Sequence, residues 1–174
     1  ELKSMDRVLR SGWWILGKEV QSFENEWSNW LGINHAVGVA NGMDAIEIGL
    51  RILDIKKGDE VITTSMTAFA TVLSIIKVGA TPVFADIEPD TAMISVDSIK
   101  RCITNKSRAV VFVHLYGQAG PVDNIKSVCD QHNIFLIEDC AQAHGAMLDE
   151  VHVGGFGQIG AWSFYPTKNL GAVG

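Results

Sequence analysis

Two unbroken apolar runs constrain the fold of this chain more than any other feature of its sequence. Residues 109–113 read AVVFV and residues 134–137 read IFLI, and neither run alternates apolar with polar side chains. Strands of this kind are covered on both faces, as they are in a parallel sheet. Segments with helical spacing separate them from other strand-like segments. We therefore predict a doubly wound α/β fold, with a mostly parallel sheet and helices on both of its faces.

Strand-like and helix-like segments alternate along most of the chain. We predict helices at residues 18–31, 43–53, 67–79, 95–103 and 121–133, from apolar periodicity and from start and stop signals. We predict strands at residues 35–40, 60–64, 81–87, 108–115, 134–139 and 160–165. Parallel α/β sheets bind ligands beyond the carboxyl ends of their strands. The residues that follow each strand are therefore the first candidates for a site.

Charge and cysteine content argue against several classes of protein. The chain has 14 Lys and Arg residues against 20 Asp and Glu, a net charge of −6, and no basic run. A nucleic-acid-binding protein normally has a basic stripe, so we expect no nucleic-acid partner. The three cysteines include no CxxC pair, which argues against a disulfide framework or a zinc ribbon. The sequence shows no signal peptide and no run of about 18 apolar residues, so we expect a cytoplasmic protein without a membrane span.

Three glycines, Gly155, Gly157 and Gly160, match the GxGxxG pattern of a dinucleotide-binding loop. Such a loop needs a strand before it, a helix after it and an acidic residue about 20 positions later. Here the strand-like residues AWSFY follow, and the sequence ends at residue 174. We interpret the segment as a flexible glycine-rich connection.

A cluster of potential metal ligands follows the strand at 134–139. Its members are Glu138, Asp139, Cys140 and His144, with His152 nearby. Asp139 and Cys140 are adjacent and would point in opposite directions. The cluster also lacks the HxxxH and HExxH spacings of known metal sites. We therefore predict no metal here.

Other residues in the same region have the chemistry of a pyridoxal phosphate (PLP) site. A carboxylate at the tip of the strand at 134–139 is costly to bury without a cationic partner, and a protonated ring nitrogen would supply one. Lys168 lies in a loop about 30 residues later and could react with an aldehyde. The small residues at 41–44 begin a predicted helix, whose free N–H groups could bind a phosphate. A lone lysine in a loop is otherwise an ordinary solvated charge, so the residues by themselves leave both interpretations open.

Six blocks of sequence resemble the DegT/DnrJ/EryC1/StrS family of PLP-dependent nucleotide-sugar aminotransferases almost from end to end. The blocks are SGWWILGKEVQSFENEWSNWLG, HAVGVANGMDAIEIGLRIL, GDEVITTSMTAFATVLSIIKVGATPVFADI, HLYGQAGPVD, IEDCAQAHGA and SFYPTKNLGAVG. The resemblance implies the large domain of a fold-type I PLP-dependent transferase. Residues 1–31 would form an N-terminal arm and helix, and residues 32–174 the α/β core. Family members are much longer, so we expect a truncated chain that lacks the C-terminal small domain.

The resemblance also implies roles for individual residues. Lys168 and Asp139 would be catalytic: Lys168 would bind the cofactor covalently, and Asp139 would hold its pyridine nitrogen. Gln142 would lie beside the phenolic oxygen, while Ser163 and the backbone of residues 42–44 would hold the phosphate. The cofactor contacts implied in this way are Gly42, Met43, Asp44, Phe69, Asp139, Gln142, Ser163 and Lys168.

The sequence departs from the family at two of these positions. Met43 stands where relatives often carry Thr, which removes a hydroxyl contact to the phosphate. Ala68 stands where relatives commonly carry an aromatic residue that stacks on the ring, and Phe69 follows it. Residues that we expect near the substrate, from their places after strands or in the N-terminal loop, are Trp14, His114, Tyr116 and His144.

The implied function is transfer of an amino group from an amino acid, usually glutamate, to a nucleotide-linked keto sugar in deoxyamino-sugar biosynthesis. Related sugar dehydratases carry His at the position of Lys168, so the lysine favours transamination. The alternatives are a truncated or split, non-catalytic fragment and a PLP-dependent dehydratase relative. Fold-type I active sites lie between two subunits, and the exposed-looking run Trp13–Leu16 is typical of an interaction surface. We therefore expect a homodimer.

Overall fold

The computed structural model describes residues 2–172, which fall into two compact units that divide after Gly38. The first unit contains helix α1 (Leu2–Ser11) and helix α2 (Lys18–Leu31). The predicted bounds of α2 are confirmed, and the helix ends where Gly32 adopts a left-handed conformation. The Trp27 ring lies 5.8 Å from that of Phe23, and Trp27 is buried, as the helical spacing requires. Helix α1, which we did not predict, has no buried residue.

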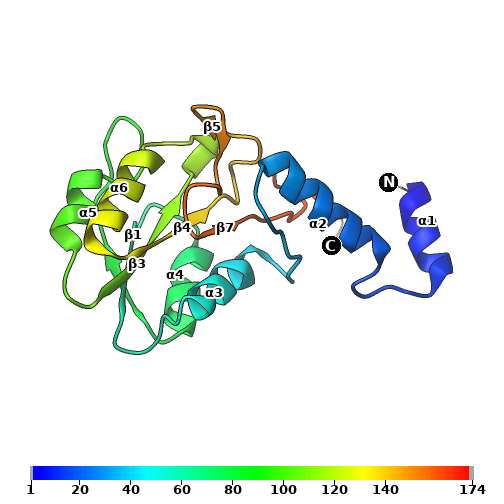
Figure 1. Cartoon of the computed structure of the whole chain (residues 1–174), viewed down its shortest axis with the longest axis horizontal. Coiled ribbons are helices and arrows are strands. Elements are labelled where there is room, and N and C mark those ends of the chain that lie inside the picture. The colour runs from blue at the N-terminus through cyan, green and yellow to red at the C-terminus, as the bar shows by residue number, and fades with distance from the viewer. Residues whose placement is uncertain (1, 173–174) are drawn as a thin grey trace. The chain divides into compact units, whose positions relative to one another are not determined.

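A five-stranded parallel sheet forms the centre of the second unit, in the order β2-β1-β3-β4-β7 (Figure 1). The strands are β1 (Glu60–Thr63), β2 (Thr81–Phe84), β3 (Ser107–Val113), β4 (Phe135–Asp139) and β7 (Ile159–Ala161). Every pairing between them is parallel, which confirms the predicted fold class. Val113 and Ala161 both pair with Asp139, so the carboxyl ends of β3, β4 and β7 lie side by side around this carboxylate.

Helices cover both faces of this sheet because its central strands are apolar on both sides. Helices α5 (Val96–Cys102) and α6 (Val122–His132) pack on one face, against Val110 and Phe112 of β3. Helices α3 (Gly42–Ile52) and α4 (Phe69–Lys77) pack on the other face, against Ala109 and Val111. The unbroken run AVVFV therefore supplies alternate side chains to two cores. A 3-10 turn, η1 (Leu115–Gly117), follows β3.

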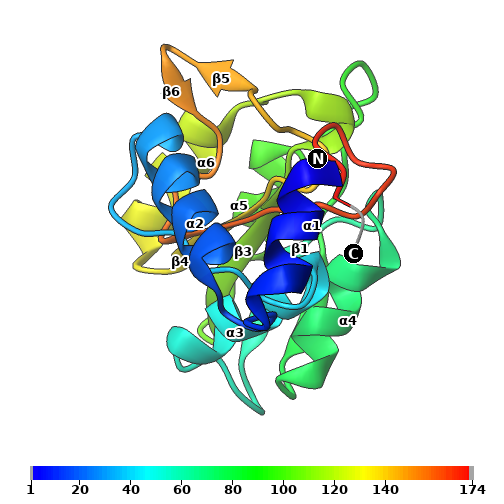
Figure 2. The same cartoon turned by 90° about the vertical axis from the view of Figure 1, so that its right-hand side faces the viewer.

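A small antiparallel hairpin, β5 (Met147–Leu148) with β6 (Val151–His152), precedes β7 and is labelled in Figure 2. Its turn residues Asp149 and Glu150 both have positive φ, without a glycine to mark the turn in the sequence. The hairpin was therefore not predicted.

The predicted strand at residues 35–40 is wrong, because the described chain offers it no partner strand. Its valines are exposed, Val37 by 77%, and the segment crosses the division between the two units. The last predicted strand is shorter than expected and covers Ile159–Ala161. Helix α6 begins at Val122, with Pro121 just before it as the cap residue. Among residues 2–172, no helix is both long and apolar enough to span a bilayer.

Candidate active site

Asp139, the last residue of β4, is a buried carboxylate with two hydrogen-bond donors. The Thr71 hydroxyl, from helix α4, donates to Oδ2 at 2.8 Å, and the N–H of Ala141 donates to Oδ1 at 3.2 Å. Burial raises the pKa of Asp139, while the Thr71 and Ala141 hydrogen bonds and the positive charges of Lys168 and His114 act to lower it. An acid in this setting is suited to a cationic partner, because burial strengthens the attraction between opposite charges.

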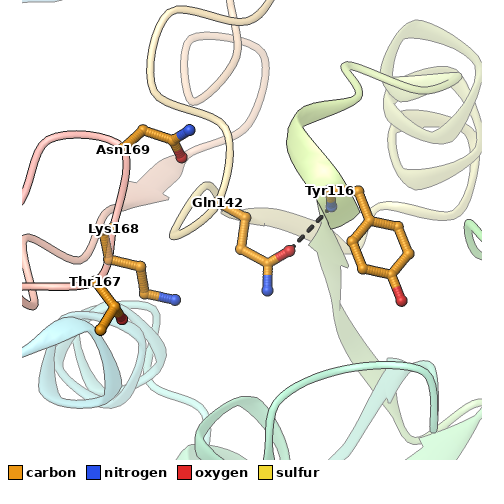
Figure 3. A pocket seen from close by; sticks show the side chains of 5 residues that line it. All are labelled: Tyr116, Gln142, Thr167, Lys168 and Asn169. Atoms are coloured by element: carbon orange, nitrogen blue, oxygen red, sulfur yellow. Dashed lines mark hydrogen bonds between the residues drawn. The ribbon is translucent and has the colours of Figure 1, made fainter.

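Lys168 lies at a cavity of about 510 Å³ that opens beyond the ends of the strands. Its volume is in the range of small-molecule sites. In Figure 3 the side chains of Lys168 and Gln142 project from separate loops toward the same space. A turn in which the Lys168 N–H donates to Tyr165 O at 2.8 Å sets the direction of the lysine loop. The residues that line the cavity are Tyr116, Gln142, Thr167, Lys168 and Asn169.

Gln142 is oriented by the backbone of Tyr116. The Tyr116 N–H donates to Gln142 Oε1 at 3.0 Å, drawn as a dashed line in Figure 3. Tyr116 adopts a left-handed conformation, with φ of 57°, which is uncommon for a residue with a side chain. Because Oε1 accepts this bond, the amide nitrogen of Gln142 is left as the group that can donate to a ligand.

The N-terminus of helix α3 lies against Ser163. A Cβ placed on Gly42 would lie 2.9 Å from Ser163 Cβ, so only glycine allows this approach. The first backbone bond of the helix runs from Ala45 to Asn41, and the N–H of Asp44 donates to Asn41 Oδ1 at 2.9 Å. The N–H groups of Gly42 and Met43 precede these bonds and point out of the helix end. Free N–H groups at a helix end are of the kind that binds phosphate, and Ser163 lies beside this end.

The structure places the four expected substrate residues very differently. His114 is fully buried, with Nε2 2.9 Å from Glu138 Oε2 and Nδ1 2.9 Å from Ala119 O, so both of its ring nitrogens have partners inside the protein. Tyr116 is exposed and lines the cavity. His144 packs edge-on against Phe164, and burial lowers its pKa. Trp14 belongs to the N-terminal unit, where its Nε1 donates to Leu9 O.

Phe69, the first residue of α4, is 73% exposed. Helix α4 also carries Thr71, which contacts Asp139. The beginning of this helix therefore lies near the Asp139 carboxylate. Its role as the stacking residue stays a prediction. The N–H of Asp44 is already bonded, so among residues 42–44 the backbone donors for a ligand are those of Gly42 and Met43.

The glycine-rich segment before β7 is not a flexible connection, which corrects our interpretation. The N–H of Gly154 donates to Glu138 Oε2 at 2.7 Å, and those of Phe156 and Gly157 donate to Oε1 at 2.8 and 2.7 Å. A Cβ on Gly157 would lie only 2.5 Å from Leu136 O, so the close approach requires glycine. The segment is wrapped around the buried carboxylate of Glu138.

Sequence reasoning missed this role of Glu138 and the role of Thr71. The partners of Glu138 lie 16 to 24 positions away, and Thr71 lies 68 positions from Asp139, so no local motif could indicate them. Ligand atoms of His114, Glu138 and Cys140 lie within 4.8 Å of one another. The four donors described above already bind the oxygens of Glu138. The cluster is therefore suited to stabilising the fold.

The model of the DegT/DnrJ/EryC1/StrS aminotransferase family matches residues 1–174. The chain belongs to this family. A curated relative, the dTDP-3-amino-3,4,6-trideoxy-alpha-D-glucose transaminase of Micromonospora megalomicea subsp. nigra, is 42% identical over 173 residues. These residues are 99% of the chain but 46% of the relative. The chain thus spans about half the length of the curated relatives it matches.

Solved structures of family members have the same fold. DesV from S. venezuelae is 41% identical and superposes with a TM-score of 0.96, over 99% of this chain and 46% of its own. NtdA from Bacillus subtilis, solved with bound cofactor PMP, is 32% identical with a TM-score of 0.94, over 99% of this chain and 39% of its own. The expected large-domain fold of a fold-type I transferase is therefore confirmed.

Proposed function

We propose that the protein of which this chain forms a part is a PLP-dependent aminotransferase acting on a nucleotide-linked keto sugar. The observation that carries the proposal is the buried carboxylate of Asp139, at the strand ends of the unit that also holds Lys168 and the open end of helix α3. Membership of the aminotransferase family and the PMP bound by the relative NtdA support it.

The residues present fit PLP at each of its polar groups. The N–H groups of Gly42 and Met43 and the nearby side chain of Ser163 suit the phosphate. The absence of a side chain on Gly42 allows helix α3 to approach Ser163 this closely. Asp139 suits the ring nitrogen, and Lys168 suits the aldehyde. The amide nitrogen of Gln142, left to donate by the bond from Tyr116, suits the phenolic oxygen.

PLP supplies an electron sink that allows the Cα–H bond of an amino acid to break. The chain's own residues would position the cofactor and transfer protons. Asp139, held ionised, keeps a proton on the ring nitrogen. Lys168 Nζ, as a free amine, would take the proton from the Cα of the amino donor and deliver it to the cofactor carbon that had carried the aldehyde. In the second half-reaction it would move a proton from that carbon to the sugar carbon that gains the amine. Gly42 and Ser163 fix the position of the ring through its phosphate.

The substrates follow the same reasoning. The relative from Micromonospora is named for a dTDP-amino sugar, so we propose a nucleoside-diphosphate keto sugar as acceptor and glutamate as amino donor, in deoxyamino-sugar biosynthesis. We also propose a homodimer, and a cytoplasmic location in keeping with the free thiols of Cys102, Cys129 and Cys140. Lys168 disfavours the dehydratase alternative, whose members carry His at this position.

The test is Lys168→Ala in the complete protein, with Lys126→Ala as the matched control. Lys126 is a surface lysine of α6 paired with Asp130, far in sequence from the site. Lys168→Ala should lose borohydride-reducible PLP and slow transamination of dTDP- and UDP-keto sugars by about 10²- to 10⁴-fold or more. The control should retain both properties. Normal turnover of Lys168→Ala would refute the assignment, and a wild-type protein that folds without taking up PLP would favour the non-catalytic alternative.

A further inference from the structure

Thr67, just before helix α4, and Thr71, in the first turn of that helix, are linked by hydrogen bonds to the Asp139 carboxylate. Thr67 Oγ1 is 2.8 Å from Thr71 Oγ1, and Thr71 Oγ1 is 2.8 Å from Asp139 Oδ2. Thr71 is fully buried, and Asp139 is 6% exposed. Both distances are in the optimal range for hydroxyl hydrogen bonds. The three side chains form a continuous hydrogen-bonded row from the helix to the site.

The ionisation of Asp139 fixes the direction of this row. A carboxylate can only accept hydrogen bonds, so the Thr71 hydroxyl must donate to Asp139. The oxygen of Thr71 is then free to accept, and Thr67 becomes the donor of the first bond. Each hydroxyl proton therefore has one place to point while the carboxylate is charged.

Thr71 is also the strongest of the groups that oppose the effect of burial on Asp139. Burial raises the pKa of this acid, and the Thr71 hydrogen bond is the largest influence that lowers it, ahead of Ala141. A site that holds a cationic ring nitrogen needs the ionised form. The row of threonines supplies a donor at one oxygen and leaves Oδ1 with the longer, weaker bond from Ala141.

We propose that Thr71 is a positioning residue, whose hydroxyl keeps Asp139 ionised and oriented toward the ring nitrogen of PLP, with Thr67 setting the direction of that hydroxyl. The proposal rests on the proposed PLP function. Other titratable groups act on the same carboxylate and are left in place by the test below. They are Lys168 and His114, which favour the ionised form; the neighbouring thiol of Cys140, whose pKa is raised by burial and by the charges of Glu138 and Asp139, is left in place as well.

The experiment compares Thr71→Val, Thr71→Ser and Thr67→Val in the complete protein. Valine has nearly the shape of threonine without the hydroxyl, and serine keeps the donor. Thr63→Val is the matched control, because Thr63 is equally buried and its hydroxyl donates to Val111 O at 3.0 Å, a carbonyl of the neighbouring strand. The cofactor is removed, and the dissociation constant of added PLP is measured by absorbance from acid to neutral pH. Thermal unfolding of the cofactor-free protein is measured in parallel.

Thr71→Val should weaken PLP binding about ten- to hundredfold, the loss of a hydrogen bond to a charged group. The acid limb of the binding curve should move to higher pH, because Asp139 without its donor takes up a proton more readily. Thr71→Ser should restore both properties, and Thr67→Val should shift the acid limb in the same direction by less. Thr63→Val should change the unfolding temperature but neither PLP affinity nor the acid limb.

Wild-type affinity and an unmoved acid limb in Thr71→Val would overturn the proposal while leaving the PLP function intact. Failure of Thr71→Ser to restore binding would overturn it as well, since the threonine would then act only through packing. Should Thr71→Val not fold, the acid limb of Thr67→Val decides, and its absence of shift overturns the proposal. A wild-type protein without affinity for PLP would overturn the proposed function itself.

Discussion

Glu138→Gln should destabilise the second unit far more than the loss of one charge on the surface of a protein. The Glu138 carboxylate is fully buried and accepts four hydrogen bonds, from His114 and from the N–H groups of Gly154, Phe156 and Gly157. His114 faces this carboxylate with one ring nitrogen and Ala119 O with the other. The ring can donate from both nitrogens only as an imidazolium, so the geometry indicates a buried ion pair.

The size of the effect follows from this geometry. Glutamine has the same shape, but one of its two terminal atoms is an NH₂ group, which would face two of the four donors. Each buried donor left without an acceptor costs about 1–3 kcal/mol. Breaking a buried ion pair from one side costs about 3–5 kcal/mol. We therefore expect a loss of about 3–5 kcal/mol, a large part of the roughly 5–15 kcal/mol that stabilises a typical protein.

The assay is urea and thermal unfolding of the complete protein, with Glu47→Gln as the control. Glu47 forms surface ion pairs with Arg51 and Lys77, so its replacement should cause a much smaller change. The midpoint for Glu138→Gln should fall by roughly 6–20 °C, at about 2–4 °C for each kcal/mol. A fall no larger than that of the control would show that the four donors find other partners, and would refute the reasoning.

Three further outcomes are expected. Asp139→Asn should lower kcat at least tenfold (about 1.4 kcal/mol) yet make the cofactor-free protein more stable at neutral pH. Burial raises the pKa of Asp139, so stability falls as pH rises through that pKa and the charged form is a net cost above it. An unchanged unfolding midpoint would contradict this sign. Gly42→Ala, whose methyl group would lie 2.9 Å from Ser163 Cβ, should weaken PLP binding about tenfold, and a titration with PLP checks it. A thiol reagent should modify Cys102 in the native protein and spare Cys129, because burial raises the pKa of Cys129 to about 12; labelling of Cys129 before unfolding would contradict this.

The features that the sequence could predict are those that depend on neighbours in the chain. The run AVVFV shows in its own composition that both faces of β3 are buried. The bounds of α2 follow from its apolar spacing and from Gly32. Residues 35–40 have the same β-branched composition as a strand but form none, because a strand depends on hydrogen bonds from another segment.

The same distinction between local and long-range features applies to the candidate site. The positions of Asp139 and Lys168 after strands could be predicted from local pattern, and so could the start of helix α3. The partners that set their chemistry could not. Thr71 approaches Asp139 from a helix on the face of the sheet, and the Gly154 N–H reaches Glu138 from a loop. Such contacts depend on how the layers pack, which no spacing within one segment encodes.

The contacts of Thr71 with Asp139 and of the Gly154 segment with Glu138 are related, because Glu138 and Asp139 are adjacent residues of β4. Adjacent residues of a strand point to opposite faces, so Glu138 and Asp139 serve different layers. Asp139 faces the α4 layer and meets Thr71, while Glu138 faces the other way and fixes the segment that runs into β7. That strand leads directly to Ser163 and the Lys168 loop. These two residues therefore supply the acid of the candidate site and hold the start of the segment that carries Lys168. A precise site needs this kind of support, in which the groups that hold the reactive side chains belong to rigid elements of the fold.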